Sequence, residues 1–240
     1  MQYQKFQDFE ILLIDDCSID GTLEVIKDFY RKDNRIIIVK NKKRKGTFWG
    51  RNLGVLFAKG KYVILPDPDD IISKNIVGLC FKYAEKYNYD IIRFNSYSGK
   101  GIIMDNLIVN NIENKNFKQP ELSTNILYLN NELVKTDHKI WNKFIKKDSY
   151  IIGLNSMAKF YLNINLAISQ DQIINYIIYR YAKSFYFLSN IGYYYIRNNM
   201  SVTKHKFQLN KISIIFSFIY LKLIICLKYK IIYFLNNFDF

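Results

Sequence analysis

The chain has few of the residues that usually punctuate or cross-link a small protein. Its 240 residues include 3 cysteines, 3 prolines, 10 glycines and 2 histidines. Cys17, Cys80 and Cys226 are far apart and odd in number, so neither a disulfide framework nor a zinc site is indicated. This usage fits a reducing compartment. We therefore expect a cytoplasmic protein, or one held peripherally on the cytoplasmic face of a membrane.

Acidic residues are also scarce relative to basic ones. Lys and Arg number 35 and Asp and Glu 21, which gives a formal net charge of 35 − 21 = +14. This charge favours a negatively charged ligand or an anionic membrane surface as partner. No Lys/Arg block with interleaved aromatics marks a nucleic-acid face, so nucleic acid is not expected. The phosphate-binding patterns G-x-x-x-x-G-K-[ST] and G-x-G-x-x-G are absent, and no charged-then-apolar leader opens the sequence as given.

The most informative motif is the acidic tetrapeptide Asp67-Pro68-Asp69-Asp70, which follows the apolar run 62–65 after Pro66. Carboxylates at this density repel one another, so at the end of a buried strand they need a cation. Hard oxygen ligands suit Mg²⁺ or Mn²⁺, which reach a protein through one or two carboxylates plus substrate phosphates. The alternative is a solvated acidic turn.

A second β-type run, residues 10–14, ends in Asp15-Asp16. Two strands that each deliver acids at their carboxyl ends indicate the ligand crevice of an open α/β sheet. The aspartates of both clusters therefore become candidate site residues.

Half of all residues are hydrophobic and 17% are aromatic, which excludes global disorder. The first half of the chain alternates between strand-like and helix-like segments. We predict strands at 9–14, 35–39, 62–65 and 90–94, and helices at 22–31, 51–59 and 76–87. Alternation of this kind predicts an α/β fold with a mostly parallel sheet and helices on its faces.

The second half is less regular. Residues 95–130 read as strands and loops, and regular structure resumes at 140–144, 172–181 and 185–196. Residues 212–235 are almost wholly apolar but are broken by lysines, so a buried or interfacial helix is expected and not a spanning one. We predict a domain over residues 1–205 and a hydrophobic, basic helical tail over 206–240.

With these pieces in order, the chain resembles a family 2 glycosyltransferase with the GT-A fold. The segments that carry the resemblance are residues 9–22 (FEILLIDDCSIDGT), Gly46-Thr47, Arg51-Asn52-Leu53-Gly54, residues 58–62 leading into Asp67-Pro68-Asp69-Asp70, Trp141-Asn142-Lys143-Phe144, Gln170-Asp171, residues 193–197 and residues 201–203. They cover roughly residues 6–203, and the tail is not covered.

The resemblance implies a role for each matching residue. Asp16 would accept a hydrogen bond from the nucleobase of a nucleotide-sugar, with Asp15 as the runner-up, and Arg51 would lie near the nucleotide. Asp69 would bind Mn²⁺ or Mg²⁺ at the diphosphate, with Asp67 in support through water or ribose. The cation stabilises charge on the leaving group.

The resemblance further identifies Asp171 as the general base that deprotonates the acceptor hydroxyl for in-line attack with inversion. The donor would be a UDP-sugar or another nucleotide-sugar, and the acceptor a glycan, lipid or protein. The family's processive members carry Gln-x-x-Arg-Trp, which is absent here, so addition of a single sugar per encounter is expected. His205 is an alternative third metal ligand.

Several positions depart from the family pattern. Cys17 replaces the usual glycine, Gly50 precedes Arg51 where Ala or Ser is common, and Gln170 replaces the first acid of a pair. Met1 falls just before the family's second strand, so the usual first strand and helix are expected to be missing. These departures leave two alternatives open: a degenerate, non-catalytic glycosyltransferase-like binding protein, or a membrane-surface protein that functions through its tail.

Overall fold

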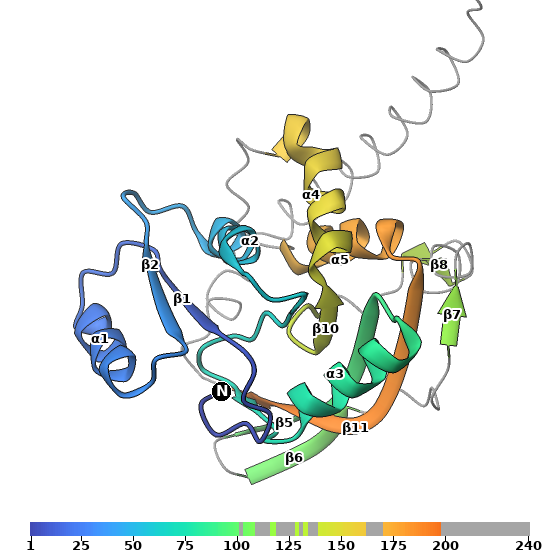
Figure 1. The fold of residues 1–240 in the computed structure, drawn as a ribbon, viewed down its shortest axis with the longest axis horizontal. Helices are drawn as coiled ribbons and strands as arrows, with labels where there is room; N and C mark the ends of the chain where they lie inside the picture. Colours follow the sequence, from blue (N-terminus) through green and yellow to red (C-terminus); the bar gives the residue numbers. More distant parts are fainter. Residues whose placement is uncertain are drawn as a thin grey trace, which may run out of the picture. The chain divides into compact units, whose positions relative to one another are not determined.

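Strands and helices alternate through the first part of the chain, as the sequence predicts (Figure 1). The structure is a computed structural model that describes residues 1–100, 103–108, 116–118, 128–129, 132–133, 139–161 and 170–197. The elements up to residue 100 are β1 (Ile11–Asp15), α1 (Thr22–Lys32), β2 (Ile36–Lys40), α2 (Thr47–Phe57), β3 (Tyr62–Val63), β4 (Ile71–Ile72), α3 (Ile76–Tyr87) and β5 (Ile91–Lys100). Each predicted strand and helix of this region is present, although β3 is shorter and β5 longer than expected.

The second half contributes more strands and two helices. These elements are β6 (Ile103–Ile108), β7 (Asn116–Lys118), β8 (Tyr128–Leu129), β9 (Glu132–Leu133), β10 (Lys143–Lys146), α4 (Lys147–Tyr161), α5 (Gln170–Tyr181) and β11 (Ser184–Ile196). Helix α5 and strand β11 match the prediction closely, whereas α4 was not predicted. The predicted tail and His205 lie outside the described residues, and no helix within the described ranges is long and apolar enough to cross a membrane.

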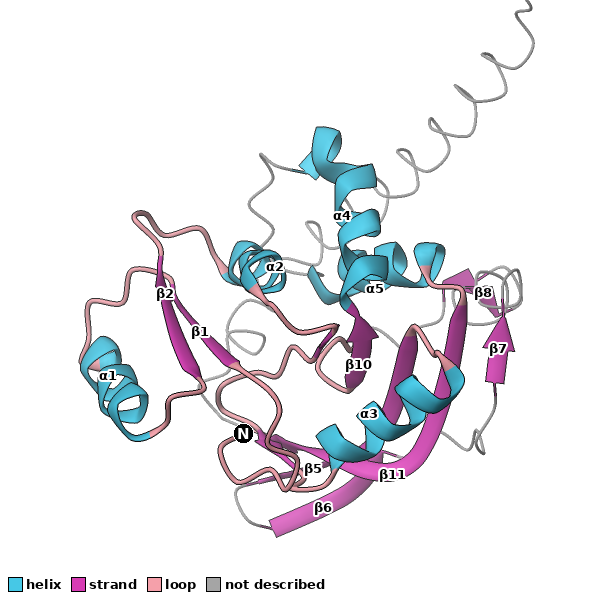
Figure 2. Ribbon diagram, viewed as in Figure 1, coloured by secondary structure: helices cyan, strands magenta, loops and turns pink. Residues whose placement is uncertain are grey.

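The described strands form one large mixed sheet and two small ones (Figure 2). In the large sheet the order is β3-β10-β5-β11-β4, with β6 on β5 and β7 on β11. The β5–β11 pair is parallel, and β10 and β4 pair antiparallel with their neighbours. Strands β1 and β2 form a separate parallel pair. The α/β architecture is therefore confirmed, and the later strands make the sheet mixed.

Helix α3 covers one face of the large sheet and forms the core with it (Figure 1). The buried cluster consists of Ile72, Ile76, Val77, Cys80, Ala84, Tyr89, Ile92, Phe94, Trp141, Phe144, Leu188 and Tyr193. Gly192 allows this close approach, because an added Cβ would come within 2.4 Å of Ile76 Cγ1 and Phe94 Cδ2. The helix ends at Tyr87, since Asn88 adopts a left-handed backbone with φ of 54°.

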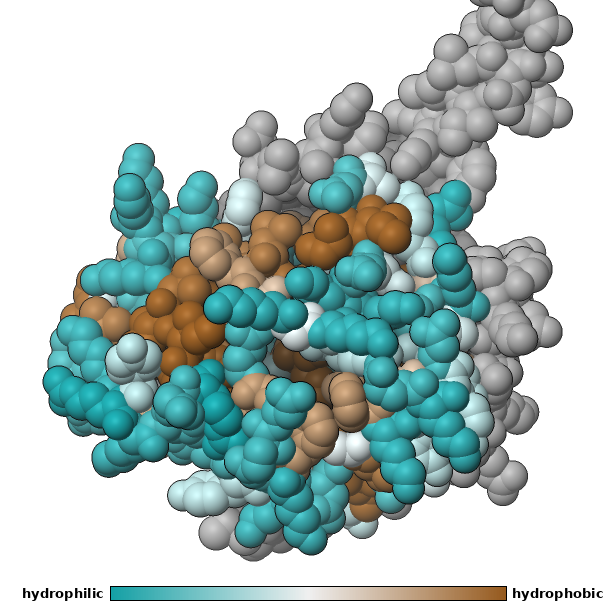
Figure 3. All heavy atoms as spheres, viewed as in Figure 1, coloured by the Kyte–Doolittle hydropathy of each residue, from teal (hydrophilic) through white to brown (hydrophobic). Residues whose placement is uncertain are grey.

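The β1–β2 pair is less well covered than the large sheet. Helix α1 has no buried residue, and its Val25, Phe29 and Tyr30 are about half exposed, at 55%, 48% and 52%. Strand β1 pairs with β2 on one edge, and no described strand pairs with its other edge. Figure 3 shows apolar residues gathered on this part of the surface. The other edge of β1 is therefore open among the described strands. This is the side on which the resemblance predicts that a strand is missing.

Candidate active site

The acidic turn of residues 67–70 lies between β3 and β4. Its backbone closes through the Asp70 N–H, which donates to the Asp67 carbonyl over 3.3 Å. Asp69 is exposed, whereas Asp67 and Asp70 are partly buried. Asp69 makes no hydrogen bond or ion pair with another described residue, so its carboxylate faces solvent and is available to a ligand.

Tyr193 of β11 forms hydrogen bonds with both ends of this turn. The Tyr193 hydroxyl accepts from the Asp67 N–H over 3.0 Å and donates to the Asp70 carboxylate over 2.6 Å. Asp70 also accepts from the Ile196 N–H over 2.8 Å. The Tyr193 side chain is fully buried and stacks on Trp141 with ring centroids 4.2 Å apart. The acidic turn is thus held on the end of the large sheet by a fixed phenol.

Arg51, on α2, connects two of the predicted site carboxylates. Its Nη2 donates to Asp67 over 2.5 Å, and its Nη1 donates to Asp171 at the start of α5. The Arg51 side chain is only 13% exposed, against 29% for Asp67 and 27% for Asp171. The helix α2, the acidic turn and the start of α5 therefore meet at one guanidinium.

Burial and neighbouring charges shift the pKa values of Arg51 and Asp67 in opposite directions. Burial alone would lower the pKa of Arg51, but the charges of Asp171 and Asp67 outweigh it and raise that pKa. Burial raises the pKa of Asp67, against the opposing effect of Arg51. Burial also raises the pKa of Asp70, which the Tyr193 hydrogen bond partly offsets. The two partly buried acids of the turn thus protonate more readily than an exposed aspartate, which suits a site completed by a cation.

The acids at the end of β1 face different surroundings. The Asp16 carboxylate accepts from Asn41 Nδ2 (2.7 Å) and from the backbone N–H groups of Lys45 (2.8 Å) and Gly46 (2.7 Å). Burial raises the pKa of Asp16, but these hydrogen bonds outweigh it and lower that pKa. Asp15 is 2% exposed, and its Oδ1 accepts from the Ser18 N–H over 3.1 Å.

The second carboxylate oxygen of Asp15, unlike Asp15 Oδ1 and the Asp16 carboxylate, accepts no hydrogen bond from a described residue. Asp15 Oδ2 is buried and has no hydrogen-bond partner among the described residues. A buried acceptor without a donor is costly, so it marks a place for a donor group from a ligand or water. Asp16, in contrast, already accepts three hydrogen bonds. The geometry therefore makes Asp15, the runner-up in the sequence, at least as suitable as Asp16 for a nucleobase N–H.

The structure brings some of the predicted site residues into direct contact and not others. Arg51, Asp67 and Asp171 form one ion-paired group, and Asp69 stands beside it on the same turn. Asp16 is connected to this group through the Gly46 N–H, because Gly46 directly precedes α2, the helix that carries Arg51. Asp15 accepts from the Ser18 N–H and makes no contact with this group among the described hydrogen bonds. The side chain of Gln170 lies outside the described residues.

Two tyrosines that support the site carried no specific sequence signal. Tyr193 was noted only within an aromatic run and was interpreted as core or edge. Tyr150, on α4, is fully buried and donates to Asn52 Oδ1 over 2.8 Å, which fixes α2 next to Arg51. These partners are 98 to 126 residues apart in sequence, so spacing could not reveal them.

The carboxylates of the acidic turn are the described groups that could hold a divalent cation. No group of three or more His, Cys, Asp or Glu side chains converges within the described part of the chain. Asp69 offers a free carboxylate, and Asp67 offers one that Arg51 now occupies. Because Mg²⁺ usually binds through one or two carboxylates plus phosphates, these oxygens fit a cation that arrives with a diphosphate.

An α/β domain with carboxylates at the ends of its strands is the arrangement that the resemblance to GT-A glycosyltransferases predicts. The sequence profile described as "Glycosyl transferase family 2" matches residues 2–147, more than half of the chain, and the chain belongs to this family.

Several known proteins are similar. Glycosyltransferase GlyG of Streptococcus pneumoniae is 30% identical over 95 residues, which are 40% of this chain and 32% of GlyG. Poly(ribitol-phosphate) beta-N-acetylglucosaminyltransferase TarS of Staphylococcus aureus is 25% identical over 192 residues, 78% of this chain and 30% of TarS. The chain thus spans about a third of the length of these relatives.

Solved structures share the fold. TarS 1–349 of S. aureus in complex with UDP-GlcNAc has a TM-score of 0.65 at 20% identity and covers 84% of this chain and 54% of that one. Mannosyltransferase PcManGT of Pyrobaculum calidifontis, in complex with GDP-Man and Mn²⁺, has a TM-score of 0.54 at 11% identity, with coverages of 85% and 53%. The predicted GT-A fold is confirmed.

Proposed function

We propose that this domain transfers a sugar from a nucleotide-sugar, a UDP-sugar, to a hydroxyl of a glycan, lipid or protein acceptor. The observation that carries the proposal is the buried Arg51, which joins Asp67 of the acidic turn to Asp171 of α5. The solved TarS and PcManGT structures with UDP, UDP-GlcNAc and GDP-Man support the donor class.

Donor binding uses Asp15 or Asp16 at the end of β1 together with the acidic turn. Asp15 Oδ2 or Asp16 accepts the nucleobase N–H, and the diphosphate lies toward Arg51 and the acidic turn. Asp69 and Asp67 would hold Mn²⁺ or Mg²⁺, which when bound supplies positive charge that stabilises the leaving diphosphate. Arg51 adds a second positive charge at the same place, and it is always protonated.

Asp171 acts as the general base, and transfer proceeds with inversion. In the free protein Arg51 holds the Asp171 carboxylate in an ion pair. A bound diphosphate competes for the guanidinium, which frees the Asp171 carboxylate to accept the proton of the acceptor hydroxyl. The coupling makes the base active only when the donor is present.

We also propose that transfer is non-processive and that the protein is cytoplasmic, with residues 206–240 on an anionic membrane surface. The absence of Gln-x-x-Arg-Trp supports the first point, and the apolar, lysine-flanked sequence of the tail supports the second. Flotation with anionic vesicles, with and without residues 206–240, tests the membrane role.

Calorimetric titration with UDP, UDP-GlcNAc and GDP-Man, with and without Mn²⁺, tests donor binding. Asp69→Asn should remove the metal-dependent part of the affinity, because it deletes one ligand charge without changing shape. Asp8→Asn, at an exposed aspartate away from the site, is the matched control. Unchanged affinity in Asp69→Asn would remove Asp69 from the metal site.

Transfer and hydrolysis assays separate the enzyme from the degenerate binding protein. Asp171→Asn should bind donor normally and lose turnover by about 10²–10⁴, the usual contribution of a positioned base. Donor binding by the unmodified chain without any turnover would favour the non-catalytic alternative, which Gln170 motivates.

A further inference from the structure

Asn175 of α5 carries a buried amide that has no hydrogen-bond partner among the described residues. The residue is 3% exposed, and both its Nδ2 and its Oδ1 are without a partner. The other buried side chains described on α5 are Ile173, Ile174, Ile178 and Tyr179, so the amide lies on a largely apolar face of the helix. Buried polar groups in native folds are nearly always paired. We therefore looked for a partner that a second conformation would supply.

The place of Asn175 on its helix indicates this partner. Helix α5 packs against α4 and carries Asp171 in its first turn (Figure 1). Asn175 follows Asp171 by four residues, so both lie on the same face of α5, one turn apart. Helical side chains lean toward the start of their helix, so Asn175 extends toward the turn of Asp171. An amide at this spacing can donate a hydrogen bond to a carboxylate.

The Asp171 carboxylate is bound elsewhere in the structure. It accepts from Arg51 Nη1 and makes no hydrogen bond with Asn175. The Asp171 side chain is 27% exposed, so it has room to rotate once this ion pair opens. Arg51 also donates to Asp67 of the acidic turn, the place toward which the proposed donor diphosphate lies. A diphosphate that takes over Arg51 would therefore leave the carboxylate without its present partner.

We propose that Asn175 is a positioning residue for the general base, and that its Nδ2–H group donates to the Asp171 carboxylate when the donor diphosphate binds Arg51. This inference rests on the proposed function and adds a residue to it. Asp171 thus exchanges Arg51, its partner in the free protein, for Asn175 in the donor complex. The new hydrogen bond fixes one carboxylate oxygen and leaves the other to accept the proton of the acceptor hydroxyl. Asn175 itself takes no proton, because its amide stays neutral.

The first test asks whether the hydrogen bond forms once Arg51 is removed. Arg51→Gln in the full chain frees the Asp171 carboxylate without any donor. NMR observes the side-chain amide protons of Asn175, which are assigned from their absence in Asn175→Leu. One of these protons should shift downfield in Arg51→Gln, and the shift should disappear when Asp171→Ala is added. In the unmodified chain, UDP with Mg²⁺ should produce the same downfield shift.

The second test separates a positioning role from a structural one. Turnover is measured as UDP release from the most active donor of a UDP-sugar panel. Asn175→Leu should lower kcat by up to about 10²-fold, the usual effect of a misplaced catalytic group, and leave KM and the UDP affinity unchanged. Its Tm should stay the same or rise, because the variant removes an unpaired buried amide. Asn175→Gln keeps the donor and should retain more of kcat.

Two controls accompany these variants. Ile178→Val, at a fully buried position of the same helix, should lower the Tm without changing kcat. In an Asp171→Asn background, Asn175→Leu should cause no further loss of turnover, because Asn175 acts only through Asp171. A further loss of equal size in that background would contradict the positioning role.

An Asn175 amide signal that is the same in the unmodified chain, in Arg51→Gln and in the double variant would overturn the proposal. An unchanged kcat in Asn175→Leu, together with a higher Tm, would also overturn it and show that Asn175 is only a structural cost. Calorimetric titration of the unmodified chain with UDP and Mg²⁺ reports on the proposed function separately. UDP binding without the amide shift would overturn this inference alone. Absence of UDP binding would overturn the proposed function, while Arg51→Gln still decides whether Asp171 and Asn175 pair.

Discussion

At the residue scale, the acidic turn depends on a single phenol. Tyr193 holds the Asp67 N–H and the Asp70 carboxylate, which leaves Asp69 between two fixed neighbours. Tyr193 is therefore a positioning residue for the turn that carries the proposed metal ligands.

Tyr193→Phe should weaken Mn²⁺-dependent UDP binding while the ring remains stacked on Trp141. The change leaves a partly buried carboxylate and an N–H without their partner, which costs about 1–3 kcal/mol of folding stability. Calorimetry gives the UDP affinity with and without Mn²⁺, and thermal unfolding gives the stability. Tyr194→Phe is the control, because the Tyr194 ring stacks on Tyr97 and its hydroxyl makes no hydrogen bond to the turn among the described residues. If both variants lower metal-dependent affinity equally, Tyr193 has no positioning role.

A second residue-scale prediction concerns acid pH. Side-chain hydrogen bonds from Arg35, at 2.9 and 2.7 Å, hold the pKa of Asp33 at about 2, below its usual 3.8. Because the folded-state pKa is lowered, this pair stabilises the fold above about pH 4 and ceases to do so as the pH falls through about 2. Carboxyl NMR titration of Asp33 should show a midpoint near 2, and Arg35→Gln should return it toward 3.8. A midpoint that Arg35→Gln leaves in place would contradict the assigned cause.

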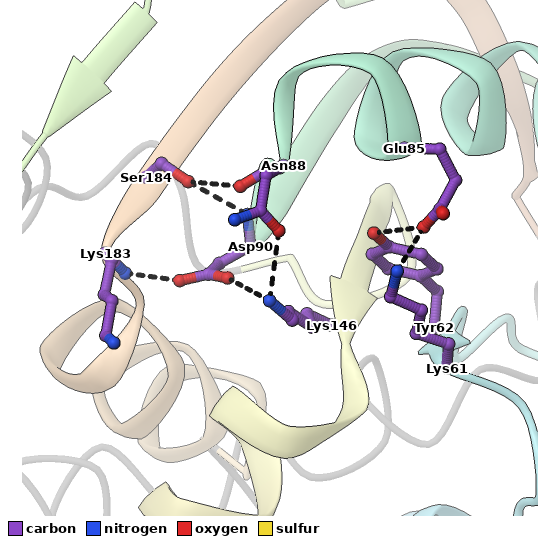
Figure 4. A network of polar contacts seen from close by, with 8 residues as sticks. All are labelled: Lys61, Tyr62, Glu85, Asn88, Asp90, Lys146, Lys183 and Ser184. Atoms are coloured by element: carbon purple, nitrogen blue, oxygen red, sulfur yellow. Dashed lines mark hydrogen bonds and ion pairs between the residues drawn. The ribbon is translucent and has the colours of Figure 1, made fainter.

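At the element scale, the starts of β5 and β11 and the end of β10 are joined by one buried carboxylate (Figure 4). Asp90 is 5% exposed; it accepts from the Lys183 N–H over 2.6 Å and lies 3.5 Å from Lys146 Nζ. Its own N–H donates to Ser184 Oγ over 3.1 Å. The neighbouring Glu85 instead pairs with Lys61 on the surface, with side chains 40% and 55% exposed.

Asp90→Ala should therefore destabilise the protein much more than Glu85→Ala. Loss of the buried carboxylate leaves the Lys183 N–H without its acceptor, at a cost of about 2–3 kcal/mol. An exposed ion pair such as that of Glu85 contributes little to stability, because water and salt screen it. Urea unfolding of both variants measures the difference. Equal losses would show that burial does not determine the contribution of these pairs.

At the scale of the whole molecule, the sequence pattern predicted the strands, the helices and the acidic positions at strand ends better than it predicted the contacts between them. Apolar runs located β1, β2 and β5, and the acids that follow apolar runs marked the site. The partners of Arg51 could not be read in the same way, because they lie 16 and 120 residues away and meet only through the order of the sheet. The antiparallel pairing of β10 was equally hidden, since periodicity gives no strand direction.

The separation of β1–β2 from the large sheet gives a last prediction. The Ile11 N–H donates to the Arg35 carbonyl and the Asn41 N–H to the Asp15 carbonyl, so in this parallel register Leu12 and Ile14 direct their backbone groups to the open edge. Amide hydrogen exchange should therefore be faster at Leu12 and Ile14 than at Leu13, whose N–H faces β2. Residue-resolved exchange by NMR measures this alternation, and the buried amides of Ile92 and Phe94 in β5 serve as the protected reference. Uniform protection along β1 would contradict an open edge and show that another strand pairs there, whereas the alternation would confirm that one strand position beside β1 is free.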